Sequence, residues 1–199
     1  TTNVAVGYNA LGKATVSENT AAGHNALDVN TTGASNTAVD NDAMGANIDG
    51  SYNTAIGYSA LLSTTNVSQN TVVGYIAASG ALSSNNAVAG ERALNAAAGA
   101  NNVAMGYRAL LSSTSANNTA VGYRAMHTNT SGTPNVAVGY DSLLTNLTGA
   151  NSVAVGTRAL TLNTASNNTA VGTYALYNTS SGTPNTAVGY NALAANQTI

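Results

Sequence analysis

Apolar residues recur at fixed places in a short repeat that runs through the whole chain. The motif is Asn, three apolar or Thr positions and then Gly, as in Asn3–Gly7, Asn53–Gly57 and Asn185–Gly189. Its last position returns every 16 or 17 residues and marks twelve coils: Gly7, Gly23, Asp40, Gly57, Gly74, Gly90, Gly106, Gly122, Gly139, Gly156, Gly172 and Gly189. So short a repeat, rich in Asn, Thr and Gly, is typical of a β-solenoid. We therefore expect residues 1–199 to form one continuous, all-β, parallel solenoid domain.

The residues just before each glycine predict a short strand with two apolar faces. The residue directly before the glycine (the outer column) is apolar in all twelve coils. The residue two before it (the Ala column) is Ala in ten coils and Val in two. Neighbouring residues of a strand point to opposite faces, so one face can fill the coil and the other needs a cover. We predict symmetric self-association through the small-residue face, that of the Ala column.

A second apolar patch follows each glycine. Ala stands three residues after it, with Ser142 as the exception, and the next residue is Leu, Met or Ala. We call this next residue the Leu column: Leu11, Leu27, Met44, Leu61, Ala78, Leu94, Leu110, Met126, Leu143, Leu160, Leu176 and Leu193. The pattern predicts a second inward-facing patch, on a second short strand after a turn.

Glycine and asparagine recur for backbone reasons. A corner after a strand often needs a positive φ, and Asp40 in place of glycine favours that explanation over close backbone contact. Asn stands four before the glycine in eleven coils (the Asn column), with Ser152 as the exception. This column predicts hydrogen bonds at a turn and an amide ladder between coils. Pro134 and Pro184 precede Asn135 and Asn185, and are expected at corners rather than in strands.

The repeat resembles that of a known class of fibre. Residues 151–156, with the sequence NSVAVG, are similar to the YadA-like head repeat of trimeric autotransporter adhesins. The NTAVGY and NVAVGY variants resemble repeats of phage tail fibres and of bacterial surface fibres, and the likeness extends over essentially all twelve coils. It differs in two respects: the coil is longer here than in the adhesin heads, and Asn usually stands where their motif starts with Ser.

The resemblance implies a left-handed β-roll assembled as a parallel homotrimer. It also implies a non-enzymatic, extracellular module on a bacterial surface or virion fibre, which attaches to a cell surface or spaces a receptor-binding tip. Thr1 opens directly into a coil and Ile199 closes one, so we expect a fragment of a longer fibre.

The composition of the chain argues against several classes of partner and site. The formal net charge is -2 and charged residues make up 6% of the chain, which predicts no nucleic-acid partner. The chain contains no Cys, and no apolar run is long enough to predict membrane insertion. His24 and His127 are isolated, and Asp40, Asp42 and Asp49 lack the closing Glu of a calcium loop. We expect no catalytic, metal or cofactor site, and hence no enzyme.

Two columns could contact a ligand. Tyr follows the glycine directly in seven coils (the Tyr column), and the next position (the Arg column) holds four arginines. The candidate stripe for contact with anionic surface glycans is Arg92, Arg108, Arg124, Arg158, Tyr107 and Tyr123. The alternative is an aromatic ladder that stiffens the stack, beside solvated arginines partly offset by Glu91 and Asp141.

A different function remains open on the strand itself. Thr stands three before the glycine in seven coils, and a flat Thr column can order water as in an ice-binding solenoid: Thr20, Thr37, Thr54, Thr71, Thr119, Thr169 and Thr186. Val or Ala interrupts this column, and no second Thr column lies two residues away. A polysaccharide-processing solenoid is disfavoured, because no adjacent coils supply paired carboxylates.

Overall fold

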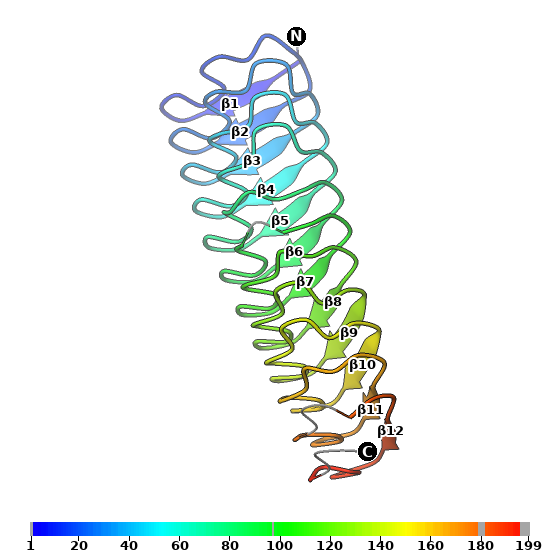
Figure 1. The fold of residues 1–199 in the computed structure, drawn as a ribbon. Coiled ribbons are helices and arrows are strands. Elements are labelled where there is room, and N and C mark those ends of the chain that lie inside the picture. The colour runs from blue at the N-terminus through cyan, green and yellow to red at the C-terminus, as the bar shows by residue number, and fades with distance from the viewer. Residues whose placement is uncertain (1, 97, 179–181, 196–199) are drawn as a thin grey trace.

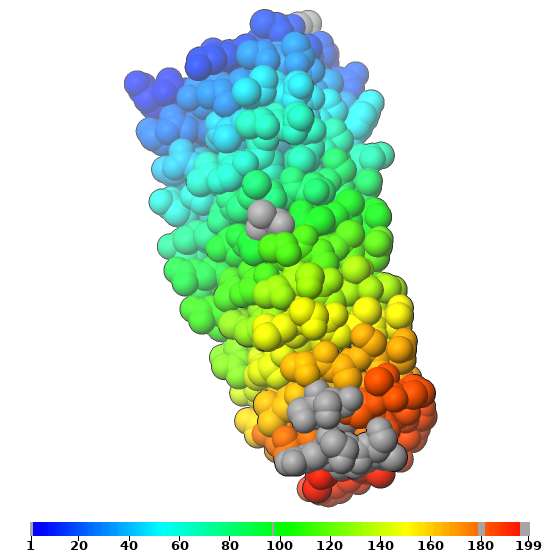
Figure 2. All heavy atoms as spheres, in the orientation of Figure 1, coloured from blue at the N-terminus to red at the C-terminus, as the bar shows by residue number. Residues whose placement is uncertain are grey.

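A computed structural model describes residues 2–96, 98–178 and 182–195, and in these ranges the chain is a parallel β-solenoid without helices. The strands are β1 (Val4–Val6), β2 (Thr20–Ala22), β3 (Thr37–Val39), β4 (Thr54–Ile56), β5 (Thr71–Val73), β6 (Ala87–Ala89), β7 (Val103–Met105), β8 (Thr119–Val121), β9 (Asn135–Val138), β10 (Ser152–Val155), β11 (Thr169–Val171) and β12 (Thr186–Val188). They form one twelve-stranded sheet in chain order. The result is an elongated rod of about eleven turns with β1 and β12 at opposite ends (Figures 1 and 2). The predicted all-β parallel solenoid is confirmed.

The strands pair in a register that places equal motif positions side by side. Ala21 of β2 pairs with Ala38 of β3, and Ala38 pairs with Ala55 of β4. The same alignment holds whether two coils are 16 or 17 residues apart, so the extra residue is accommodated outside the strands. Each sequence column therefore becomes a straight row along the rod.

The Ala column fills the interior of the rod, which corrects the prediction that it forms the self-association face. Its members are buried in β2 to β12, whereas the outer column points away from the core. The reason is the Leu column, whose side chains from Leu27 to Leu176 are fully buried in the same core and favour small residues opposite, although Val88 is buried in the same coil as Leu94. One coil shows the reciprocal arrangement: the larger Val72 stands in the Ala column where the Leu column holds the smaller Ala78.

The second strand predicted after each glycine is wrong, because a stacked turn stands in its place. The Leu column has left-handed backbone conformation, with φ of 52° at both Leu27 and Leu110, and the Arg column does too, with φ of 53° at Arg92. Two left-handed residues in alternation bend the chain and prevent extension. Hydrogen bonds between coils compensate, as from Leu110 N to Ala125 O at 3.0 Å.

The glycine column has two causes rather than the single one expected. All eleven glycines have positive φ, such as 128° at Gly57, which confirms the first part of the prediction. Close backbone contact, which was disfavoured, is present as well: a Cβ on Gly57 would lie 2.6 Å from the carbonyl oxygen of Gly74. Asp40 takes φ of 99° in the same column.

The predicted asparagine ladder is confirmed. The Oδ1 atom of each Asn accepts a hydrogen bond from the backbone N–H of the next member, as from Asn53 to Asn36 at 3.0 Å and from Asn102 to Asn86 at 2.8 Å. These side chains are buried, and their Nδ2 atoms donate to carbonyl oxygens inside the coil, as Asn53 does to Val67. Pro134 and Pro184 lie outside the strands, as expected.

Candidate functional site

The outward face of the sheet, which we call the strand face, carries a row of exposed apolar residues along the rod. It consists of the outer column and the Thr-rich column two residues before it. In β4, for example, Ala55 is fully buried while Ile56 is 40% exposed. Its most exposed apolar members are Val4, Val6, Ile56, Val73, Met105, Val136, Val138, Val155, Val171 and Val188. So long an apolar row is unusual for a monomer.

The Tyr column forms the aromatic ladder that the sequence allowed. Tyr107, Tyr123 and Tyr140 stack in succession with ring centroids 5.1 Å apart, and Tyr58 stacks on Tyr75 at 5.4 Å. Offset stacking of this kind stabilises neighbouring coils directly. The ladder reading of the Tyr column is thus confirmed, whereas a contact of Tyr107 and Tyr123 with glycans stays a prediction.

The Arg column is divided by one acidic residue. Arg124 donates two hydrogen bonds to Asp141, from Nε at 2.9 Å and from the terminal nitrogen at 3.0 Å, and Arg158 Nε lies 3.9 Å from the same carboxylate. The Asp141 side chain is only 3% exposed, so its charge is desolvated and paired. Its hydrogen bond raises the pKa of Arg124, while the neighbouring Tyr174 raises that of Arg158.

Arg92 and Arg108 stand apart from this cluster. Within the described ranges neither has a carboxylate at ion-pair distance, and Glu91, expected to offset them, makes no ion pair there. The Arg108 guanidinium lies over the Tyr107 ring, 4.9 Å from its centroid. In the part of the chain that the structure describes, the four arginines thus differ in their pairing: Arg124 and Arg158 share Asp141, whereas Arg92 and Arg108 have no carboxylate partner.

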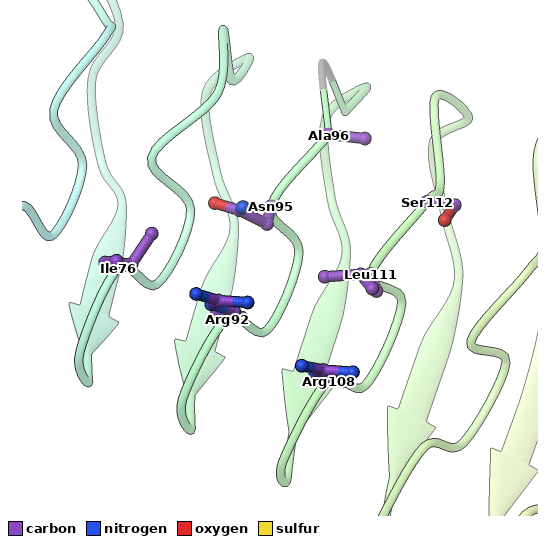
Figure 3. Close-up of a pocket in the computed structure, with 7 residues that line it drawn as sticks. All are labelled: Ile76, Arg92, Asn95, Ala96, Arg108, Leu111 and Ser112. Atoms are coloured by element: carbon purple, nitrogen blue, oxygen red, sulfur yellow. The ribbon is translucent and has the colours of Figure 1, made fainter.

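A depression of about 580 Å³ lies beside these two arginines. Figure 3 shows Ile76, Arg92 and Arg108 in equivalent places on three successive coils, with the remaining lining residues further along the same coils: Asn95, Ala96, Leu111 and Ser112. Those four were missed in the sequence. They occupy the fifth and sixth positions after the glycine in two adjacent coils, so reading these columns beside the Arg column would have found them.

Ionisable and metal-ligating side chains are few outside the Tyr and Arg columns in the described residues. No group of three or more His, Cys, Asp or Glu side chains gathers in the described part of the chain. Asp42 accepts a hydrogen bond from Asn25 at 3.1 Å, which continues a polar row between coils, and His24 stacks on Tyr8. In the residues that the structure covers, no helix is long and apolar enough to span a bilayer.

His127 provides a test of local burial. Desolvation, with the charges of Arg124 and Arg108, lowers its pKa below the ordinary 6.5. The unfolded chain therefore binds more protons between the two pKa values, so the free energy of unfolding is undiminished above 6.5, falls as the pH drops from 6.5 to the folded pKa, and is constant below it. Leu111 and Leu144 hold the same position in the adjacent coils, so H127L should fold. We expect the Tm of H127L minus the Tm of the wild type to increase as the pH is lowered from about 7.5 to about 5.5. A constant difference would contradict the burial effect.

Comparison of the chain with protein-family models, with curated proteins and with solved structures finds no match.

Proposed function

We propose that this chain is a non-enzymatic module of an extracellular fibre, on a bacterial surface or a virion, which assembles as a parallel homotrimer and attaches to a cell surface or spaces a receptor-binding tip. The observation that carries the proposal is the strand face. It runs along the entire rod with apolar side chains such as Ile56, Val73 and Val138 between 37% and 41% exposed. Covering such a face by further copies buries it symmetrically.

Parallel association also fits the strand face because every coil presents the same columns in the same register. Because each column is a straight row, three rods that wrap the strand face around one axis bring like residues to the same level at every coil. The Tyr and Arg columns come directly after the strand and its glycine in each coil. In the proposed trimer they lie beside the strand face and stay open for contact with other molecules. The resemblance to adhesin heads and tail fibres supports the attachment role.

Sedimentation equilibrium tests the assembly. We expect a mass three times the 19.6 kDa of a single chain, independent of loading concentration in the micromolar range. A well-ordered single chain under these conditions would overturn the trimer, and with it the fibre function. A stable dimer would retain an association surface but contradict the threefold axis.

Ice binding is the second candidate, because the same face carries threonines in register. Thr20, Thr37, Thr54 and Thr71 pair in succession on four neighbouring strands. They lie outside the core, beside the outer column. The two functions compete for one surface, since a trimer axis would exclude ice from it. Thermal hysteresis by a single-chain species would favour this candidate over the fibre.

A further inference from the structure

The charge on the Arg column is compensated at one end only. Asp141 serves both Arg124 and Arg158, whereas the described residues place no carboxylate at ion-pair distance from Arg92 or Arg108. The Nε atom of Arg108 is shielded from solvent and has no hydrogen-bond acceptor in the described part of the chain. Two guanidinium groups that are both half-buried and on adjacent coils repel each other, and an anion between them would remove that cost.

The depression beside them supplies more than charge. Asn95 Oδ1 accepts a hydrogen bond from the backbone N–H of Ser79 at 3.1 Å, which leaves the amide NH2 of Asn95 as a donor. Leu111, Ile76 and Ala96 give the same depression an apolar part, as Figure 3 shows. Donors and aliphatic carbon side by side in one depression match a ligand that is anionic at one point and has a C–H surface beside it.

We propose that this depression binds a sugar acid, with its carboxylate between the guanidinium groups of Arg92 and Arg108 and its ring against Leu111. Arginine recognises the two oxygens of a carboxylate through paired N–H donors. A hydroxyl group of a neutral sugar has one oxygen and no charge, so it cannot accept this pair of charge-assisted hydrogen bonds. The proposal deepens the attachment function above and rests on it for the source of the saccharide. It narrows the contact surface to two of the four arginines.

The coil repeat itself supplies a substitution that preserves the fold. The Arg column holds Asn in other coils, at Asn9, Asn25 and Asn191, with φ from 54° to 56°. Arg92 and Arg108 have φ of 53° and 54°, so the double variant R92N/R108N keeps a residue that adopts this conformation readily. R158N is the matched control, because it removes one charge from the same column at φ of 56° but outside the depression.

The experiment is calorimetric titration of the assembled protein with a glucuronate-containing oligosaccharide, its neutral glucose counterpart and inorganic phosphate. We expect the glucuronate oligosaccharide alone to bind, with affinity falling by about tenfold or more in R92N/R108N and by less than about twofold in R158N. Binding should also weaken as NaCl rises from about 50 to about 300 mM.

Each other outcome overturns the site. Equal binding of the neutral sugar would show that the carboxylate is not recognised. Tight binding of phosphate would show that the site does not need a saccharide. An equal loss of affinity in R158N would show that Arg92 and Arg108 are not a distinct site. Absence of all binding rejects the proposal. Sedimentation of the same samples reports the trimer separately, so a trimer without binding refutes this inference and leaves the fibre intact.

Discussion

Replacing Gly106 by Ala is expected to lower the free energy of unfolding by about 3–6 kcal/mol, a large effect for a single methyl group. Two costs combine. The backbone at Gly106 has φ of 133°, a region that L-residues rarely adopt. A Cβ there would also overlap the carbonyl oxygen of Gly122 and lie 2.7 Å from its carbonyl carbon. Both atoms are backbone of the next coil, so neither can move aside without breaking the β7–β8 pairing.

The last glycine of the column separates these two costs. Gly189 has φ of 122°, but no atom of the described residues lies within 4 Å of the Cβ it would carry. G189A should therefore lose only the conformational part, about 1–3 kcal/mol. Urea unfolding followed by circular dichroism, at one fixed protein concentration, measures both variants. Equal losses would show that the contact between coils costs nothing and that φ alone explains the glycine column.

The rows of the rod were predictable because the repeat is strict. Once the glycines are aligned, each column of the sequence is a row in space, and this is why the Asn ladder and the stacked Tyr107, Tyr123 and Tyr140 follow from spacing alone. The parallel sheet follows too, since consecutive strands with equal positions must pair in register. These features depend on periodicity and on little else.

The orientation of the strand was not predictable from alternation. Both faces are apolar, and which face turns inward depends on the width of the coil interior. That width is set by Leu residues such as Leu27 and Leu110, which lie in left-handed turns. Leucine rarely adopts this conformation, so its backbone preferences do not predict it. With the Leu column buried there, the position opposite takes Ala in most coils, with Val72 and Val88 as buried exceptions, and the outer column faces away from the core.

The candidate site was half predictable for a similar reason. The column alone places Asp141 between Arg124 and Arg158, so their shared ion pair could be read from the sequence. The depression beside Arg92 and Arg108 depends on how far side chains of another column project from a turn, and that needs coordinates. Stripes of charge in a solenoid are thus best read together with the columns that flank them.

A charged strand face should separate the proposed trimer into single chains. Val138 and Val155 lie in the outer column of neighbouring coils and are 37% and 36% exposed in the single chain. In the trimer that we propose, both lie at the shared axis, so V138D/V155D brings six carboxylates together without water or counter-charge. Each buried unpaired charge costs several kcal/mol, and like charges at short distance add repulsion.

The same change on another part of the coil is the matched control. Leu147 is 47% exposed in the loop between β9 and β10, so L147D adds a carboxylate to each chain without touching the strand face. Sedimentation equilibrium should report a single chain for V138D/V155D and three chains for L147D. Because both valines already point away from the core, the coil itself should keep its circular dichroism spectrum at low temperature, with a lower Tm once the partners are lost. If V138D/V155D keeps the wild-type mass, the apolar row is covered by something other than a second copy, and the threefold axis lies elsewhere.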